Sequence, residues 1–235
     1  MKDTSLAGFN VGVDNVIFSV DTTANRLQVL LCRSPTEPLA NSWRLPGTLV
    51  QVGESLEDAA HRSLSEKFTA KNLYLEQLYT FGGGKRTTTE SEGIADMRYL
   101  SVSYFALVHF EDVVLAPQDQ QIAWHTLHAI PSLVAEHKPI LDYGYRRLRN
   151  KLEYSPIAFD VLPEVFTLNE IYQLYGTILG PQFSDYSNFR ARLLKLGILF
   201  DTGEKVTRGA GRPASLYRFD ADAFAPLKDK PLVFV

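Results

Sequence analysis

The chain has 235 residues, of which 45% are apolar and 22% charged, and this composition is typical of a folded globular protein. The length is sufficient for one α+β domain of catalytic size and a smaller second domain. The sequence contains no run of eighteen apolar residues and no N-terminal segment of signal-peptide type, which disfavours membrane insertion and secretion. The single cysteine, Cys32, excludes an intrachain disulfide framework and a multi-cysteine metal site, so we expect a cytoplasmic protein.

The net charge of −3 conceals an uneven distribution of charge along the chain. Between residues 184 and 218, seven Lys and Arg residues stand against three Asp and Glu residues, a local charge of +4. Clustered basic residues of this kind favour a polyanionic partner such as nucleic acid.

Strands dominate the first half of the predicted fold. Four apolar runs predict β-strands, the first two forming a hairpin: residues 11–20, 27–32, 74–81 and 99–110. A helix is predicted over residues 55–68, because Ser55 and Asp58 approximate a capping box and apolar residues recur every fourth position. With a second helix near residues 131–152, this order predicts an α+β sandwich over residues 1–150.

The second half, residues 151–235, has the element order of a winged helix-turn-helix. The basic segment 141–152 predicts a linker helix in which Gly144 is a soft point. Two helices follow over residues 167–179, with Thr167 and Glu170 as a capping box, and 184–196. Two short strand-like runs, 198–201 and 216–219, then bracket a glycine-rich loop, as in a wing.

Residues 45–67 resemble the signature of the Nudix hydrolases, GX5EX7REUXEEXGU, aligned by Pro46-Gly47, Gly53-Glu54 and Arg62. Glu54 and Arg62 keep the spacing, whereas Ser63 and Lys67 stand where the signature has glutamates. Hydrolysis of a phosphoanhydride by this family needs Mg²⁺ on several carboxylates of one helix face. We therefore expect neither a metal site nor catalytic residues, but a cleft that meets phosphate directly.

The predicted ligand contacts share a position in or near this cleft: Arg33, Arg44, Glu54, Arg62, Glu66, Lys67 and Phe81. Other interpretations exist for several of them. Glu54 and Arg62 are alternatively a simple surface ion pair, and aromatic strand residues such as Phe81 are most often core. His125 and His128 lack acidic or cysteine partners at ligand spacing, so a structural role is expected for both.

The recognition helix is predicted at residues 185–195, with Phe189, Leu193 and Leu196 facing the core. Asn and Arg side chains read adenine and guanine edges, and loop arginines suit the DNA backbone or minor groove. The predicted DNA contacts are Ser187, Asn188, Arg190, Arg192, Lys195, Arg208 and Arg212. The alternative is a protein-interaction module, since winged helices also serve that role.

Nearly the whole chain resembles the Nudix-related transcriptional regulators of NAD metabolism, in which a degenerate Nudix domain precedes a winged helix. The resemblance is carried by residues 9–14, 79–82, 148–154, 166–171, 187–190 and 212–219. It implies a homodimeric bacterial repressor that needs no cofactor, senses ADP-ribose or a related NAD metabolite, and releases operator DNA when that ligand binds. The loop after Phe81 departs from the family pattern, which leaves the exact effector open. The rival hypothesis is a Nudix hydrolase of nucleoside diphosphate derivatives with an appended interaction module.

Overall fold

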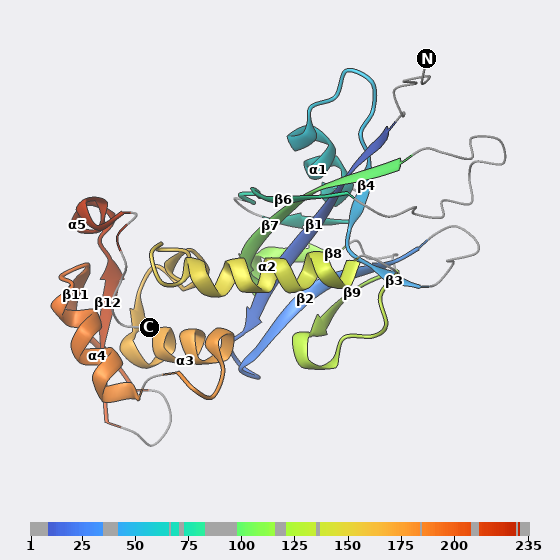
Figure 1. The fold of residues 1–235 in the computed structure, drawn as a ribbon. Helices are drawn as coiled ribbons and strands as arrows, with labels where there is room; N and C mark the ends of the chain where they lie inside the picture. Colours follow the sequence, from blue (N-terminus) through green and yellow to red (C-terminus); the bar gives the residue numbers. More distant parts are fainter. Residues whose placement is uncertain are drawn as a thin grey trace, which may run out of the picture. The chain divides into compact units, whose positions relative to one another are not determined.

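The computed structural model describes residues 9–34, 42–65, 67–70, 73–82, 98–115, 121–134, 137–183, 185–207, 212–228 and 230 (Figure 1). The chain separates into two compact units. The first contains residues 1–19, 28–106 and 111–145, and the second contains residues 20–27, 107–110 and 146–235. Within the described ranges, every helix is too short or too polar to cross a membrane.

A seven-stranded sheet forms the centre of the Nudix-type half. Five strands follow the order β3-β2-β1-β7-β6, while β4 pairs with β1 and β9 with β2. Their bounds are β1 Phe9–Asp21, β2 Arg26–Arg33, β3 Trp43–Arg44, β4 Gly47–Leu49, β6 Glu76–Gly82, β7 Arg98–His109 and β9 Ile122–Thr126. The predicted hairpin is confirmed as β1 and β2, whose turn is closed by Asp21 accepting from the N–H groups of Thr23 and Ala24.

Two helices cover opposite faces of the sheet. Side chains alternate between the two faces along β1, so neighbouring residues of this strand contact different helices. Asn15 donates to Ser63 of α1 (Leu56–Ser65) at 2.8 Å. Val16 points the other way, towards Gly144 of α2 (His137–Lys151). The first half of α2 therefore packs on the face opposite α1, which confirms the predicted α/β/α sandwich (Figure 1).

Gly144, which the sequence predicts to be a soft point of α2, is a point of close packing, and its softness stays a prediction. A Cβ atom at this position would lie only 3.0 to 3.3 Å from three side-chain atoms of Val16. The missing side chain allows α2 to approach the sheet closely.

The first helix is shorter than predicted. It ends at Ser65, and the Lys67 N–H then donates to the Leu64 carbonyl at 2.8 Å in a tight turn. Phe68 begins β5 (Phe68–Ala70), which pairs with β8 (Val113–Leu115), and its ring is 4% exposed. Strand pairing thus overrides the helical spacing of Phe68. The 3₁₀ turns η1 (Phe110–Asp112) and η2 (Leu127–Ala129) complete this half.

The second unit is a winged helix-turn-helix, as predicted. Helices α3 (Leu168–Leu179) and α4 (Tyr186–Lys195) precede a sheet of order β10-β12-β11. Its remaining elements are β10 Phe166–Thr167, β11 Leu199–Val206, β12 Ala214–Phe219, α5 Ala221–Phe224, and the 3₁₀ turns η3 Phe159–Val161 and η4 Ala225–Leu227. The predicted capping box is confirmed: Thr167 Oγ1 accepts the Glu170 N–H at 3.2 Å, and Glu170 Oε2 accepts the Thr167 N–H at 2.7 Å.

Candidate functional site

The segment between β4 and α1 is held by a bidentate ion pair. Arg62 donates from Nε to Glu54 Oε1 at 2.7 Å and from Nη2 to Oε2 at 2.9 Å. It also donates to Thr48 Oγ1 at 3.3 Å and to the Leu49 carbonyl at 3.0 Å. Arg62 thus uses four hydrogen bonds to bind its own chain. Arg62 therefore links residues 45–54, called the box segment below, to α1.

Glu54 remains ionised because of this arrangement. The hydrogen bond from Arg62, followed by the N–H of Gln51, lowers the pKa of Glu54 from 4.5 to about 2. A carboxylate with such a low pKa is a weak proton acceptor at neutral pH.

The described side chains at the box positions do not fit a divalent cation. Ser63 is 1% exposed, and its Oγ accepts from Asn15 and donates to the Ala60 carbonyl at 2.9 Å. Lys67 Nζ donates to the Ser63 carbonyl at 3.0 Å, which places an ammonium group at the end of the helix. A hard cation requires several oxygen ligands from one face. Glu66 lies outside the described residues, among which His, Cys, Asp and Glu form no cluster of metal-ligand type.

Arg33 and Arg44 lie on opposite faces of the sheet. In the β2–β3 register Arg33 pairs with Trp43 and Cys32 with Arg44, so the two arginines alternate in direction. Arg44 Nη1 donates to the Gly47 carbonyl at 3.3 Å, next to the residues that Arg62 contacts. Its Nε is buried and has no hydrogen-bond partner within the described ranges. Arg44 is therefore the arginine of the two that reaches the box segment.

Arg33 belongs to an aromatic stack. Its guanidinium lies 4.3 Å from the centre of the Trp43 ring, which contacts His125 edge-on at 4.3 Å. Burial, followed by the charge of Arg33, lowers the pKa of His125. His125 is therefore neutral at neutral pH, and the structural role expected for it stays a prediction.

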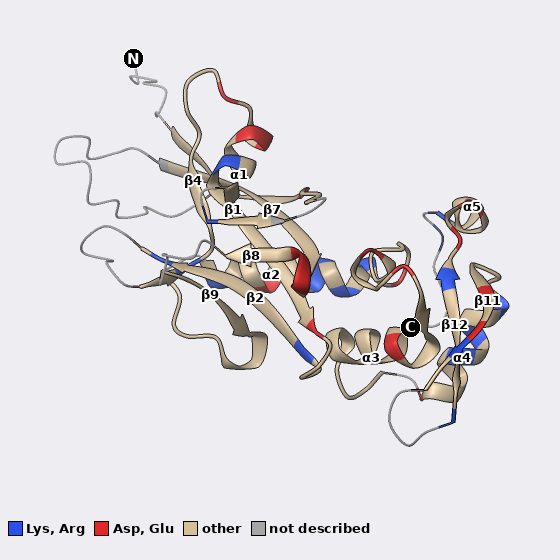
Figure 2. Cartoon of the chain, turned by 180° about the vertical axis from the view of Figure 1, so that it is seen from behind, with Lys and Arg blue, Asp and Glu red and all other residues tan. Residues whose placement is uncertain are grey.

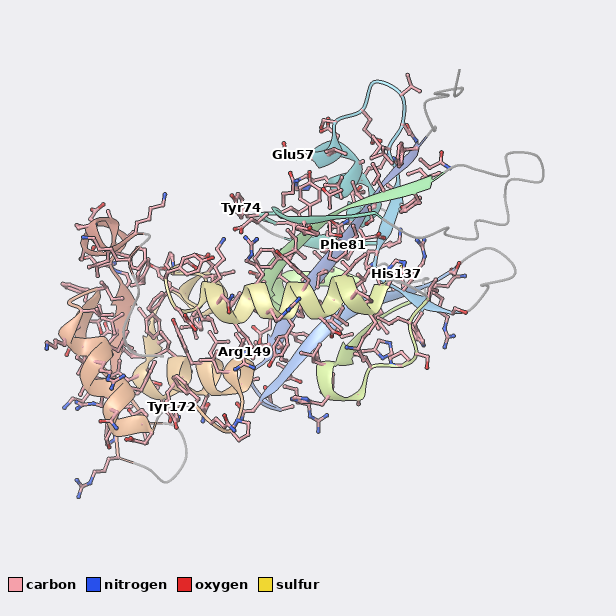
Figure 3. The ribbon with its side chains drawn as sticks, in the orientation of Figure 1. Glu57, Tyr74, Phe81, His137, Arg149 and Tyr172 are labelled. Carbon is pink, nitrogen blue, oxygen red and sulfur yellow. The ribbon has the colours of Figure 1, made fainter. Side chains whose placement is uncertain are left out.

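Phe81 lies beside α2 and not beside α1. Its ring is 5.2 Å from that of Tyr79 and 5.9 Å from that of Tyr143 in α2. Phe81 is labelled in Figure 3. Tyr79 stacks on Tyr143 at 5.1 Å and is 53% exposed. Of the predicted ligand contacts that are described, the structure gathers Arg44, Glu54, Arg62 and Lys67 around β4 and α1, whereas Arg33 and Phe81 lie elsewhere.

The predicted recognition helix, α4, presents its polar residues to solvent. Ser187, Asn188, Arg190, Arg192 and Lys195 are all exposed, while Phe189 and Leu193 are buried. Lys and Arg positions, in blue, recur along α4 in Figure 2. Asp185 caps the helix, and its pKa is lowered first by the Asn188 N–H. The Asn188 amide also donates to Asp185, so base contact requires exchange of that bond. Arg212 is exposed, and Arg208 lies outside the described residues.

An aromatic cluster supports α4 from within the second unit. Tyr172 and Tyr175 of α3 contact Phe183 and Phe189 at ring distances between 5.4 and 5.8 Å. Tyr175 is fully buried, burial raises its pKa, and its hydroxyl donates to the Leu152 carbonyl at 3.4 Å. No role for these tyrosines could be predicted from the spacing of α3 alone.

A second group missed by the sequence analysis is a buried polar cluster in the first unit. Ser101 Oγ donates to Asp14 Oδ2 at 2.5 Å, and His137 Nδ1 accepts the Leu45 N–H at 3.2 Å. His137 Nδ1 also lies 3.9 Å from Asp14 Oδ1. The charged residue within the apolar run 11–20 was the available signal.

Comparison with known proteins agrees with this two-part architecture. The NUDIX domain family matches residues 9–147, and the AraR C-terminal winged HTH domain family matches residues 154–235. The ADPR responsive transcriptional repressor NtrR of Acinetobacter baylyi is 35% identical over 214 residues, covering 88% of this chain and 80% of that protein. The chain belongs to the Nudix-related transcriptional regulators.

Solved structures of another Nudix-related regulator show the same fold. NrtR of Shewanella oneidensis in complex with a 27mer DNA is 30% identical, with a TM-score of 0.72 over 91% of this chain and 94% of that one. The NUDIX domain of the same protein in complex with ADP ribose is 25% identical, with a TM-score of 0.50 over 63% of this chain and 94% of that one. These likenesses confirm the predicted fold class, a Nudix domain followed by a winged helix-turn-helix.

Proposed function

We propose that this chain is a transcriptional repressor that binds operator DNA through its winged helix and ADP-ribose through its Nudix domain. One observation carries the proposal: the exposed basic helix α4 belongs to the same chain as a Nudix box in which Ser63 and Lys67 replace carboxylates and hydrogen-bond to their own chain. The similarity to a repressor and to a regulator solved with DNA supports it.

The effector is bound without a cofactor and without hydrolysis. Arg44 contacts the Gly47 carbonyl and Lys67 contacts the Ser63 carbonyl at the end of α1. We propose that both offer positive charge to a pyrophosphate, a role that Mg²⁺ has in the hydrolases. The Glu54 carboxylate accepts hydrogen bonds from Arg62, and the buried Ser63 hydroxyl accepts one from Asn15. This disposition argues against the rival hypothesis of a nucleoside diphosphate hydrolase.

Operator recognition requires two copies of the chain. Helix-turn-helix dimers place their recognition helices about 34 to 36 Å apart, one turn of DNA, so that each reads a half-site. We propose a homodimer in which Arg192 and its neighbours on α4 read bases, while Arg208 and Arg212 contact the backbone or minor groove.

A binding assay with a parallel hydrolysis assay tests the proposal. The full chain is titrated onto DNA from upstream of its own gene, with and without ADP-ribose, and AMP release is followed under Mg²⁺. We expect specific binding that ADP-ribose weakens, and no steady release of AMP. Release of AMP that Glu66→Gln abolishes, or DNA binding without sequence preference, would overturn it.

A further inference from the structure

The first turn of α4 carries a negative charge in a helix that is otherwise basic. Asp185 is the N-cap residue and the only acidic residue of the segment 185–195, which also contains Arg190, Arg192 and Lys195. All four of these side chains belong to exposed residues. Recognition helices of the helix-turn-helix type contact base edges with their N-terminal residues. Asp185 therefore lies at the end of α4 that is expected to meet the bases.

The Asp185 carboxylate uses the groups at this helix end that would otherwise attract phosphate. Its Oδ1 accepts the N–H groups of Ser187 at 3.0 Å and of Asn188 at 3.1 Å. The unpaired N–H groups of a helix N-terminus commonly bind phosphate. In α4 two of them are already bonded, and the acceptor that bonds them is an anion. Phosphate therefore meets fewer donors and a repelling charge at the first turn.

Asp185 keeps its charge at neutral pH. The hydrogen bond from the Asn188 N–H lowers the pKa of the Asp185 carboxyl, and bonds from the Asn188 side chain and the Ser187 N–H act in the same direction. These donors are uncharged groups, so they stabilise the carboxylate without cancelling its charge. The repulsion of phosphate is therefore present throughout the physiological pH range.

The second carboxylate oxygen is bonded to a donor that DNA can replace. Asn188 Nδ2 donates to Asp185 Oδ2, and both residues are exposed. An exposed bond of this kind contributes little net free energy, because other donors can take its place. Each base pair presents one amino group in the major groove, N6 of adenine or N4 of cytosine. Such an amino group is a donor like the Asn188 amide and suits the same oxygen.

We propose that Asp185 is a specificity-determining residue of the operator-binding surface: it excludes phosphate from the first turn of α4 and accepts from the amino group of an adenine or a cytosine. The base amino group replaces Asn188 Nδ2 on Oδ2, which frees that amide to contact a neighbouring base. A backbone phosphate cannot make this exchange, because it has acceptors and no donor. The inference rests on the proposed function, since it needs DNA at α4.

The exclusion of phosphate is tested by the ratio of operator affinity to affinity for a scrambled duplex of equal length. Asp185→Ser keeps a good N-cap and removes the charge. We expect it to raise affinity for the scrambled duplex by about 5- to 10-fold, the size of one hydrogen bond to a charged group at an exposed site. Operator affinity should not rise, because the base contact is lost. Asp222→Ser is the control: it removes an exposed carboxylate from α5 of the same unit and should leave the ratio unchanged.

The base contact is tested with operator DNA that lacks single amino groups. Each adenine is replaced in turn by purine, and each cytosine by 2-pyrimidinone, its analogue without the amino group. In each half-site we expect one position at which wild type loses about 5-fold or more in affinity while Asp185→Ser loses little. The base replaced at that position decides between adenine and cytosine.

Two results would overturn the proposal. An unchanged affinity ratio in Asp185→Ser would assign Asp185 to helix capping alone. Equal losses in wild type and Asp185→Ser at every replaced amino group would exclude the base contact. By contrast, wild-type protein that binds the operator and the scrambled duplex equally would refute the proposed function itself.

Discussion

Helices α1 and α4 both contain arginines that the sequence alone does not distinguish, but the structure places them in different surroundings. Arg62 of α1 is turned inward, where Glu54, Thr48 and Leu49 accept its hydrogen bonds. Arg190 and Arg192 of α4 are exposed on a helix whose core contacts come from Phe189 and Leu193. A basic residue in a helix therefore indicates a binding surface only when the structure leaves its side chain exposed.

The largest expected effect comes from removing the support of α4. Phe189→Ala deletes a fully buried ring that contacts Tyr172, Tyr175 and Phe183, and should destabilise the protein by about 3 to 5 kcal/mol. Operator binding should fall with it, while ADP-ribose affinity stays within a factor of about three. Denaturant unfolding and ligand titration measure the two effects. Unchanged stability would show that the aromatic cluster does not hold α4.

Replacing an exposed arginine of α4 should weaken operator binding without changing the stability of the fold. Arg192→Ala should weaken specific operator binding by about 1 to 3 kcal/mol and leave ADP-ribose affinity unchanged. Lys138→Ala is the control. It removes one charge of the exposed Lys138–Asp142 pair in α2, a different helix from α4, and should change operator affinity little. Competition binding against non-specific DNA measures the loss. Undiminished specific affinity in Arg192→Ala would remove α4 as the recognition helix.

The close approach of α2 to β1 should show as a non-additive pair of substitutions. Gly144→Ala should gain about 1 kcal/mol of helix propensity but lose about 1 to 3 kcal/mol because its Cβ overpacks Val16, so we expect a net loss of stability of up to about 2 kcal/mol. In Val16→Ala the same change meets a smaller side chain, so its additional cost should be lower by about 0.5 kcal/mol or more. Urea unfolding of the two single variants and the double variant supplies the cycle. Strict additivity would contradict the packing described for Gly144.

The smallest effect is expected at the ion pair of the box. The folded-state pKa of Glu54 lies near 2, below its ordinary value of 4.5. The contribution of ionised Glu54 to stability is therefore fully present above pH 4.5 and is lost as the pH falls towards 2. Wild type and Glu54→Gln should differ in unfolding free energy at pH 6 and converge near pH 2. A pH-independent difference would contradict the role of the carboxylate charge.

Much of the architecture could be predicted because it follows from local patterns. The capping box of Thr167 and Glu170, the hairpin of β1 and β2, and the buried stripe of α4 each depend on residues close in sequence. The end of α1 was wrong by three residues, because Phe68 gains more from pairing in β5 than from continuing the helical stripe. The short strands β3, β4, β8 and β9 are too brief to show an alternation of their own.

The candidate site was less accessible to sequence analysis. Whether Arg33 or Arg44 reaches the box depends on strand register, which the spacing of eleven positions does not reveal. His137 meets Leu45 across 92 positions, and Ser101 meets Asp14 across 87, so only the tertiary fold brings them together. The assignments of individual ligand and DNA contacts stay predictions.

The central claim is that one chain couples a ligand in a non-catalytic Nudix domain to DNA at a winged helix. Titration of ADP-ribose into free and operator-bound protein, under Mg²⁺ and with product analysis, tests it most directly. Linkage requires that operator DNA weaken ADP-ribose binding by the same factor by which ADP-ribose weakens operator binding, about 1 to 3 kcal/mol in typical systems. We predict this equality with ADP-ribose recovered intact. Equal ADP-ribose affinities in the free and bound protein, or its turnover to AMP, would contradict the claim.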